Sequence, residues 1–252
     1  MTETQIKPTE AEITVSDGIY AKYIKRAMDF FLSFCAIVVL SPIMIVLTVV
    51  GAIAMKGNPF FTQLRPGKID KKTGSEKIFR LIKFRTMTCE RDKDGNLLTD
   101  DKRLTKYGKF LRSTSLDELP ELINILKGDM AVIGPRPQLV KDMVFMTERQ
   151  RMRHKVRPGL SGLAQISGRN AINWENKLNY DLEYIQQITF LGDFKIILFT
   201  IKKVFERADI STEGMETAED FGDWLLNSEI IPIDEYRKKR EYANKLLEMK
   251  RG

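Results

Sequence analysis

The most apolar part of the chain is the segment 30–55, which contains 26 residues and no charged side chain. A helix needs about 20 consecutive apolar residues to cross the hydrocarbon core of a bilayer, so this segment is long enough to enter a membrane. Ser41 and Pro42 lie in its middle. A proline inside a helix removes one hydrogen bond and clashes with the preceding turn, which predicts a kink or a break at this pair.

Only the eleven residues 30–40 precede this pair within the apolar segment. At about 1.5 Å per residue they cover roughly half of a bilayer core. Basic residues flank the segment on both sides, with Lys25 and Arg26 before it and Lys56 after it. Positive charge favours the cytoplasmic side, so both ends are expected there. Two forms stay open, a re-entrant helix-break-helix over 23–56 and a single kinked helix that crosses the bilayer.

The remaining pattern of apolar and polar positions predicts a small β-hairpin and several helices. The segments 60–65 and 77–87 are rich in aromatic and β-branched residues, with turn formers between them, which is typical of a hairpin. The segment 100–112 is amphipathic and fits a helix that lies on a membrane surface or packs on a core. Further helices are predicted over 116–127, 143–153, 174–187, 190–207 and 236–251. The fold class is therefore α+β and mainly helical.

These elements divide the chain into four parts. A flexible, polar N-terminus covers 1–22, the apolar segment 23–56, a soluble domain 57–205 and a C-terminal extension 206–252. Within the extension, the apolar residues of 221–226 either dock on the domain or belong to a loosely packed acidic linker. We favour the linker.

Charge gives a first indication of function. The 252 residues include 41 Lys and Arg and 34 Asp and Glu, a net charge of +7, and the segment 62–115 alone carries 15 bases against 7 acids. Such a surplus fits an anionic partner: nucleic acid, anionic lipid or a phosphorylated small molecule. Two cysteines are too few for a disulfide framework, and the single histidine excludes a multi-histidine metal site. We expect that this histidine, His154, lies at the surface or supports residues of a site, and that it is not a catalyst.

Adjacent carboxylates at Asp117 and Glu118 are the strongest candidates for chemistry. The structural interpretation is that Ser115 and Glu118 form a capping box at the start of a helix whose dipole favours acids. Pro120 fits poorly at the fifth position of such a helix, which moves its start towards Asp117 or distorts its first turn. The chemical interpretation is a carboxylate nucleophile that attacks phosphorus, beside a second carboxylate that holds a divalent cation.

Several basic residues are candidates for contacts with phosphate groups. Lys83 and Arg85 alternate in a predicted strand, which directs both to one face. Arg136 lies between two prolines that keep the backbone rigid, although a purely structural turn is an equally good interpretation. Arg157 and Arg169 flank a glycine-spaced loop that could approach a phosphate or a nucleobase closely. The loop has neither the Walker A nor the dinucleotide-binding spacing.

In their order along the chain, these motifs resemble the bacterial sugar transferase family, the monotopic polyprenyl-phosphate phosphoglycosyl transferases that begin glycan assembly on a lipid carrier. The resemblance covers residues 23–205 and rests on the joint pattern, because each motif alone is weak. The motifs are Lys25-Arg26, Ser41-Pro42, Lys83-Phe84-Arg85-Thr86-Met87, Arg112 to Pro120, Gly134-Pro135-Arg136-Pro137 and Arg157-Pro158-Gly159-Leu160-Ser161-Gly162.

The resemblance implies a re-entrant helix that turns at Ser41-Pro42, interfacial amphipathic helices, and a catalytic domain on the cytoplasmic face of the bacterial inner membrane. It implies a two-step reaction in which Asp117 attacks the β-phosphate of a UDP-sugar and UMP leaves. Polyprenyl (undecaprenyl) phosphate then takes the phosphosugar from the enzyme. Glu118 is associated with Mg²⁺, and Arg112 and Arg136 lie near phosphate groups. Further substrate-binding candidates are Lys83, Arg85, Arg157 and Arg169.

Such a reaction is the first membrane step in the assembly of a capsule, O-antigen, exopolysaccharide or glycoprotein glycan, and the sequence does not identify the sugar. The chain lacks the extra membrane helices and N-terminal domain of long family members, so we expect a compact form, alone or as a homo-oligomer. The alternative function is a non-catalytic, membrane-anchored binding protein for anionic lipid or nucleic acid. No nucleic-acid motif appears, so we expect no nucleic-acid partner.

Overall fold

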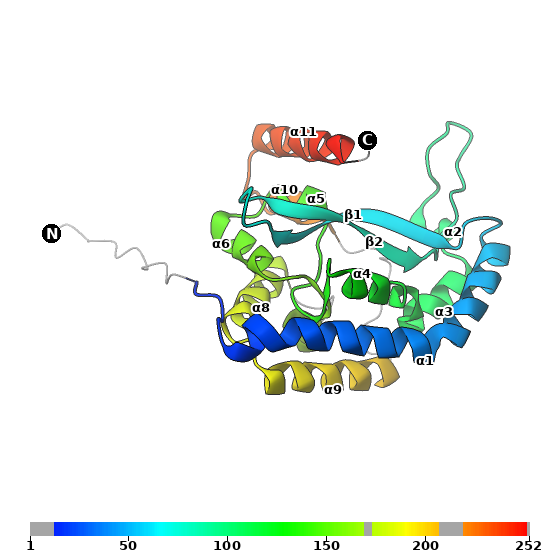
Figure 1. Cartoon of the computed structure of the whole chain (residues 1–252). Coiled ribbons are helices and arrows are strands. Elements are labelled where there is room, and N and C mark those ends of the chain that lie inside the picture. Colours follow the sequence, from blue (N-terminus) through cyan, green and yellow to red (C-terminus); the bar gives the residue numbers. More distant parts are fainter. Residues whose placement is uncertain (1–12, 169–172, 207–218, 251–252) are drawn as a thin grey trace.

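The structure is a computed structural model that describes residues 13–168, 173–206 and 219–250. It is mainly helical with two short sheets, which confirms the predicted α+β class. The helices, labelled in Figure 1, are α1 (Lys25–Ala54), α2 (Asp100–Arg103), α3 (Lys106–Thr114), α4 (Glu121–Lys127), α5 (Val140–Met143), α6 (Glu148–Arg151), α7 (Leu163–Ser167), α8 (Trp174–Gln186), α9 (Phe190–Glu206), α10 (Phe221–Asn227) and α11 (Ile233–Met249).

The predicted hairpin is present as β1 (Phe60–Ile69) and β2 (Glu76–Phe84), which pair antiparallel. A second, unpredicted sheet consists of β3 (Ala131–Ile133) and β4 (Gly159–Ser161), which pair parallel. Short turns of other helix types complete the fold. They are a π-helical turn over Tyr20–Ile24 and 3₁₀ turns over Leu116–Glu118 and Met152–Lys155.

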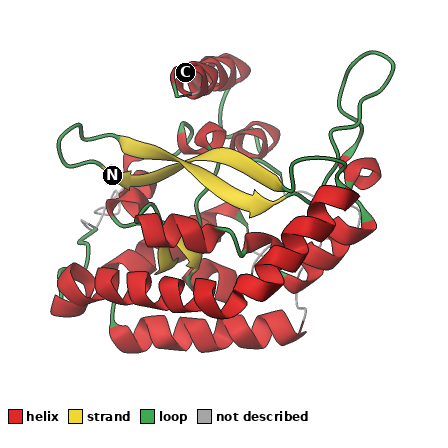
Figure 2. Cartoon of the chain, turned by 45° about the vertical axis from the view of Figure 1, so that its right-hand side comes forward, coloured by secondary structure: helices red, strands yellow, loops and turns green. Residues whose placement is uncertain are grey.

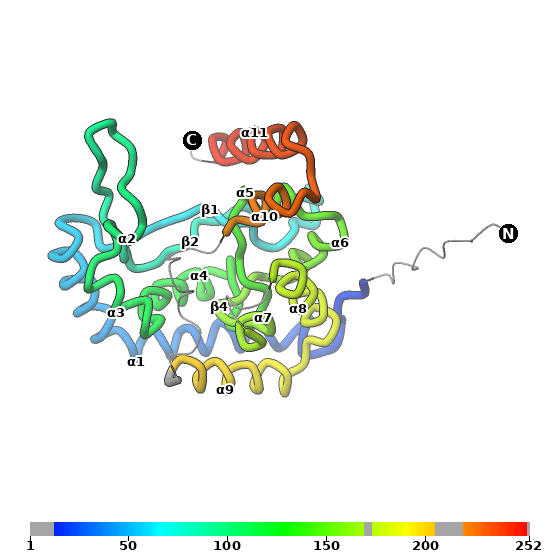
Figure 3. The backbone as a smooth tube through the Cα atoms, turned by 180° about the vertical axis from the view of Figure 1, so that it is seen from behind, coloured from blue at the N-terminus to red at the C-terminus, as the bar shows by residue number. Residues whose placement is uncertain are grey.

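The elements are stacked in layers, with α1 and α9 side by side along one edge and α11 on the opposite side of the hairpin (Figures 1 and 3). Helix α4 lies between α1 and the hairpin. Its Ile125 is buried, together with Met130, against Phe79 and Leu81 of β2, and Ile37 of α1 packs on the same cluster. This core holds the N-terminal end of α4 beside the end of β2, and the acidic dyad, Asp117 and Glu118, lies on the 3₁₀ turn just before α4.

Helix α1 continues through Ser41 and Pro42 and is bent rather than broken (Figures 1 and 2). The predicted helix-break-helix over 23–56 is therefore corrected to one bent helix from Lys25 to Ala54. Pro42 has no N–H to donate to the carbonyl of Val38, four residues earlier. The hydroxyl of Ser41 donates to that carbonyl instead, at 2.8 Å. Because the freed carbonyl is satisfied, the helix can bend at the proline without ending.

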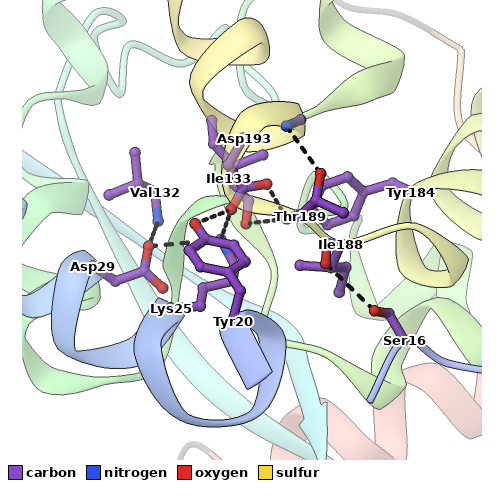
Figure 4. Close-up of polar contacts among 11 residues, drawn as sticks. Ser16, Tyr20, Lys25, Asp29, Val132, Ile133, Tyr184, Ile188, Thr189 and Asp193 are labelled. Atoms are coloured by element: carbon purple, nitrogen blue, oxygen red, sulfur yellow. Dashed lines mark hydrogen bonds and ion pairs between the residues drawn. The ribbon is translucent and has the colours of Figure 1, made fainter. Parts of the chain in front are cut away.

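A buried polar network, drawn in Figure 4, binds the start of α1 to the rest of the protein. Lys25 Nζ lies 2.6 Å from Asp193 Oδ2 at the start of α9. The hydroxyls of Tyr20 and Tyr184 donate to the same carboxylate at 2.8 and 2.9 Å. One turn further along α1, Asp29 accepts a backbone N–H of β3 at 2.9 Å. These contacts connect α1 to α8, α9 and β3.

The end of α1 contacts the same domain. Tyr107 of α3 donates its hydroxyl to the carbonyl of Leu47 at 2.8 Å, and Leu47 packs with Phe84 and Leu111. Gly51 lies so close to α3 that a Cβ would be only 3.0 Å from the Tyr107 hydroxyl oxygen. The soluble domain therefore holds α1 near both of its ends.

Two of the predicted helices are divided. The segment 100–112 forms α2 and α3, because Thr105 is extended and its side chain accepts the N–H of Gly108 at 2.9 Å, which caps a new helix. The segment 143–153 is likewise divided where Thr147 caps α6. The helices predicted over 174–187, 190–207 and 236–251 correspond to α8, α9 and α11.

The C-terminal extension packs on the domain, so the expectation of a loose linker is wrong for residues 219–250. Phe221 is 2% exposed, and its ring centroid lies 5.1 Å from that of Trp174. The neighbouring Gly222 lies so close to Phe145 that a Cβ would overlap the ring. The backbone N–H of Phe221 also donates to Asp142 at 3.0 Å. These apolar residues form a core with α8 despite their acidic surroundings in sequence.

Candidate active site

The predicted dyad lies on the 3₁₀ turn between α3 and α4. Ser115 ends α3 in the left-handed conformation, with φ of 57°. Within the described part of the chain its side chain makes no helix cap, so the capping box with Glu118 does not form. Helix α4 begins only after Pro120. The helix start is therefore irregular, as this proline predicts. Asp117 and Glu118 are thus free of the backbone roles that a regular helix start would give them.

Glu118 is paired with two cations. Lys83 Nζ, near the end of β2, lies 2.7 Å from Glu118 Oε1, and Arg136 Nη2 lies 2.9 Å from the same oxygen. Arg136 comes from the Pro-Arg-Pro turn that follows β3. The fold therefore brings predicted residues from three separate segments of the chain to one place.

Glu121 belongs to the same cluster, although its sequence position indicates only the start of a helix. It is buried in the first turn of α4, and its Oε1 lies 3.0 Å from Lys83 Nζ. Burial raises the pKa of Glu121 to about 7, with a further contribution from the charge of Glu118. The spacing of three residues between the two glutamates is the signal in the sequence that places them on the same side of the turn.

The two carboxylates of the dyad have different electrostatic surroundings. Burial, and then the charge of Glu118, raise the pKa of Asp117 to about 6. Burial would raise the pKa of Glu118 as well, but Lys83 and Arg136 outweigh it and hold that pKa well below its usual range. No described residue makes a hydrogen bond or an ion pair with the Asp117 carboxylate. Asp117 is therefore a partly desolvated acid that is available to react, whereas Glu118 is a fixed anion.

Arg112 lies beside this cluster, and Arg85 follows the strand that carries Lys83. Arg112, in the last turn of α3, donates from Nε to the hydroxyl of Thr86 at 3.2 Å, and its charge favours the ionised form of Asp117. Arg85 follows the end of β2, where its backbone N–H donates to the carbonyl of Pro59 at 2.7 Å. Among the described residues, none forms an ion pair with the Arg85 guanidinium, which leaves it available to an anionic ligand.

Arg157 is placed at the opposite end of α4 from the dyad. Its Nε donates to the carbonyl of Gly128 at 2.8 Å, and Arg26 donates to the last carbonyls of the helix at 2.7 and 2.9 Å. Both arginines complete a helix C-terminus, where free carbonyls favour cations. The structure therefore gives Arg157 a structural position, and Arg169 lies outside the described residues.

The dyad fits a divalent cation that is shared with a substrate. The side chains of Lys83 and Arg136 both contact Oε1 of Glu118, and no described residue occupies its Oε2. Mg²⁺ is commonly held by one or two carboxylates together with phosphate oxygens rather than by a complete protein cage. Among the described residues, no group of three or more His, Cys, Asp or Glu side chains is arranged to hold a metal.

One edge of the molecule, formed by α1 and α9, is apolar and exposed. Helix α1 and the turn before it, from Tyr20 to Ala54, are long and apolar enough to cross a membrane by length and composition. Helix α9 lies beside α1 and also exposes apolar side chains (Figures 1 and 2). The most exposed of them include Phe31, Val39, Ile45 and Ile53 on α1 and Leu191, Phe194, Leu198 and Ile201 on α9.

A domain that carries a cluster of carboxylates and cations is thus joined to a helix long and apolar enough to cross a membrane. Residues 20–207 match the family model described as bacterial sugar transferase. The match covers most of the chain, so the protein belongs to the bacterial sugar transferase family, which confirms the resemblance seen in its motifs.

Similar curated proteins agree with this assignment. The chain is 47% identical over 179 residues to the uncharacterised sugar transferase EpsL of Bacillus subtilis, which covers 70% of this chain and 86% of EpsL. It is 38% identical over 191 residues, 72% of this chain and 40% of the relative, to UDP-glucose:undecaprenyl-phosphate glucose-1-phosphate transferase of Klebsiella pneumoniae. It is 32% identical over 206 residues, 74% of this chain and 41% of the relative, to undecaprenyl-phosphate galactose phosphotransferase of Salmonella typhimurium.

The chain thus spans most of EpsL and about two fifths of the two longer relatives. The family and these relatives identify it as an enzyme, a phosphoglycosyl transferase by class. The alternative of a non-catalytic binding protein is therefore wrong.

Proposed function

We propose that the protein transfers a sugar-1-phosphate from a UDP-sugar to polyprenyl phosphate, giving polyprenyl diphosphate-sugar and UMP. The observation that carries this proposal is the contrast within the dyad. Asp117 is an available carboxylate, and its neighbour Glu118 is held at 2.7 and 2.9 Å by two cations that suit phosphate oxygens. The names of relatives support undecaprenyl phosphate as the acceptor, and because those relatives use glucose and galactose, the sugar itself stays open.

In the first step, a carboxylate oxygen of Asp117 attacks the β-phosphorus of the UDP-sugar. The bond between this phosphorus and the bridging oxygen breaks, and UMP leaves with the electron pair. The sugar phosphate remains on the enzyme as an acyl phosphate. Lys83 and Arg136 lie beside the dyad and stabilise the negative charge on the phosphate oxygens as the displacement proceeds.

In the second step, an oxygen of polyprenyl phosphate attacks the same phosphorus. The bond from Asp117 to phosphorus breaks, the carboxylate is restored, and the phosphosugar is joined to the lipid through a diphosphate. The attacking phosphate oxygen is already anionic, so no base has to remove a proton. Two easier displacements thus replace one direct transfer.

Glu118, through its available Oε2, is the residue that would hold Mg²⁺ together with the diphosphate of the donor. Mg²⁺ bound there would supply positive charge that offsets the charge of the phosphate oxygens, so that they could approach two carboxylates. Without a cation, Asp117 and Glu118 would repel an anionic substrate.

The apolar edge formed by α1 and α9 lies in the cytoplasmic membrane of a bacterium, with the catalytic domain on the cytoplasmic face. If the 30-residue helix α1 were straight, it would be about 45 Å long, which exceeds the roughly 30 Å thickness of the hydrocarbon core. A spanning helix would carry one end away from the domain, yet Arg26 and Leu47 both contact it. These contacts support a re-entrant course, and the reaction is then the first membrane step in assembly of a capsule, O-antigen, exopolysaccharide or glycoprotein glycan.

Release of UMP tests the proposal. Purified full-length protein is mixed with undecaprenyl phosphate, Mg²⁺ and one of a panel of UDP-sugars that includes UDP-glucose, UDP-galactose and their N-acetylated counterparts. At least one donor should release UMP, and Asp117→Asn should abolish the release while the protein stays in the membrane fraction. After incubation with that donor alone, mass spectrometry should find a phosphosugar on the peptide carrying Asp117. Normal turnover by Asp117→Asn would exclude Asp117 as the nucleophile.

A further inference from the structure

The turn that carries Arg136 is held at three successive carbonyls. A backbone N–H of β4 donates to the carbonyl of Pro135 at 3.0 Å. Arg153 Nη2 donates to the carbonyl of Arg136 at 2.6 Å, and Arg65 Nη1 donates to that of Pro137 at 3.0 Å. The two prolines have no N–H of their own. The three carbonyls are therefore the principal backbone groups through which the surrounding elements can hold this turn.

Arg153 is almost completely buried, so its charge is removed from water at a cost in free energy. It is 1% exposed, and its Nε and Nη2 lie 2.9 and 2.6 Å from Oδ2 of Asp181 on α8, which is 2% exposed. Burying two charges costs free energy that is regained only through good geometry and additional hydrogen bonds. An apolar pair of similar volume would support a fold equally well. The buried pair therefore indicates a role beyond stability.

One nitrogen connects that pair to the site. Nη2 of Arg153 contacts both the carboxylate of Asp181 and the carbonyl of Arg136, at 2.6 Å each. Asp181 thus determines where the guanidinium of Arg153 lies, and that guanidinium determines where the backbone of Arg136 lies. The side chain of Arg136 then reaches Glu118 at 2.9 Å. A continuous set of contacts leads from α8 through the turn to the dyad.

His154 supports Arg153 on its other side and is buried, not at the surface. Arg153 Nη1 lies 3.3 Å from His154 Nε2, and His154 Nδ1 lies 3.1 Å from Glu76 Oε1. Burial is the main reason that the pKa of His154 falls to about 4. The ring is therefore neutral near pH 7, so that Nε2 accepts from Arg153 while Nδ1–H donates to Glu76. This arrangement keeps its charge state over the pH range in which Asp117 titrates.

We propose that Arg153, held in place by Asp181, is a positioning residue for Arg136. It fixes the backbone of the Pro-Arg-Pro turn so that the guanidinium of Arg136 meets Glu118 and the phosphate of the sugar donor. The inference rests on the function proposed above for Arg136. Displacement of a catalytic group by about 1 Å can lower a rate by about 100-fold, so a fixed turn has a direct value for the reaction.

Double-mutant cycles test this role in the full-length protein, by UMP release from the UDP-sugar that the panel identifies. Asp181→Asn and Arg153→Lys should each lower kcat/KM by about 10- to 100-fold when Arg136 is present. In the Arg136→Ala background each should lower the remaining rate by less than about threefold, because no guanidinium is left to position. Arg153→Lys keeps the buried charge but not the fork that reaches two partners, so it remains informative if Asp181→Asn does not fold.

The matched control is Tyr107→Phe, which removes a hydrogen bond between α3 and the carbonyl of Leu47 on α1 rather than one that holds the turn. Its effect should be the same factor in both backgrounds, as for a change that acts through stability. If Asp181→Asn and Arg153→Lys lowered the rate by the same factor with and without Arg136, the positioning role would be overturned. A normal rate for Arg136→Ala alone would instead overturn the assignment of Arg136 in the proposed function, and the positioning role with it.

Discussion

Lys83 and Glu118 are 35 residues apart in the sequence and form an ion pair of 2.7 Å at the centre of the candidate site. The same ammonium also lies 3.0 Å from Glu121. One lysine near the end of the hairpin therefore pairs with two acids, Glu118 on the 3₁₀ turn and the buried Glu121 at the start of α4. A cation so placed both permits two acids to lie together and provides positive charge for a phosphate group.

Replacing that lysine should therefore damage stability and activity together. Lys83→Met keeps much of the volume but leaves Glu118 and Glu121 facing each other with one partner fewer. Removing one member of a buried ion pair costs about 3–5 kcal/mol, and we expect a loss of unfolding free energy in that range. UMP release should fall as well. Denaturant unfolding in detergent measures the first effect and the UMP assay the second.

The matched control is Lys77→Met, on the same strand. Lys77 is 66% exposed and pairs with Asp129 at 3.2 Å, so its loss should cost less than about 1 kcal/mol. Equal effects of the two substitutions would show that Lys83 is not a buried structural and catalytic cation.

Asp117→Asn should abolish activity and yet stabilise the protein. The pKa of Asp117 in the folded state is about 6, above its ordinary value of 3.8, so folding disfavours the ionised form. The associated stability is present below the ordinary pKa and is lost as the pH rises towards about 6. A neutral amide avoids this cost, and at pH 7 we expect a gain on the order of 1–3 kcal/mol. Thermal unfolding of the two proteins at pH 7 measures the difference.

Glu118→Gln should destabilise the protein. Burial raises the pKa of Glu118, but Lys83 and Arg136 outweigh burial and hold this pKa low. Its contribution is present above the ordinary glutamate pKa and is lost at lower pH. The substitution leaves two cations without their shared anion, which destabilises the folded state. If Asp117→Asn and Glu118→Gln both stabilised the protein, the two carboxylates would not differ in their electrostatic surroundings as described.

The rate of UMP release should fall on the acidic side with an apparent pKa near 6. Asp117 must be ionised to attack phosphorus, and burial and the charge of Glu118 raise its pKa to about 6. Because the neighbouring acids interact, this value belongs to the cluster and not to one group alone. The profile of kcat/KM from pH 5 to pH 8 measures it. An acidic limb with a midpoint below pH 5 would mean that the nucleophile is not desolvated.

Local motifs predict much of the site, because Lys83, the dyad and Arg136 each lie in a short segment with a recognisable pattern. Arg153 and Asp181 escape such a prediction, since charged residues are usually exposed and these two are 28 positions apart. The sequence of α1 predicts a disturbance at Pro42, but not that the Ser41 hydroxyl satisfies the freed carbonyl and lets the helix continue. The glycine-rich setting of Arg157 suggests a ligand loop but does not reveal that its Nε donates to the carbonyl of Gly128, at the end of α4.

The C-terminal extension should contribute to the stability of the domain, although the family match ends at residue 207. Phe221 is 2% exposed and packs against Trp174, so Phe221→Ala should cost about 3–5 kcal/mol of unfolding free energy. Ile233→Ala, at an exposed position of α11, is the matched control and should cost little. Thermal unfolding of the two variants measures the effect. A change in melting temperature for Phe221→Ala no larger than that of the control would show that the extension is not part of the folded core.

The outward face of α9 should lie among lipid acyl chains. Leu198 is 51% exposed on a helix that lies beside α1, whereas Tyr242 is 56% exposed on α11, across the molecule (Figures 1 and 3). In vesicles of lipids brominated on the acyl chains, tryptophan emission from Leu198→Trp should be quenched, because an apolar face of an interfacial helix is buried about 5–10 Å into the membrane. Tyr242→Trp has a similar exposure and should show no more quenching than the native Trp174 and Trp224 alone. Equal quenching at the two positions would mean that α9 does not define the membrane side of the protein.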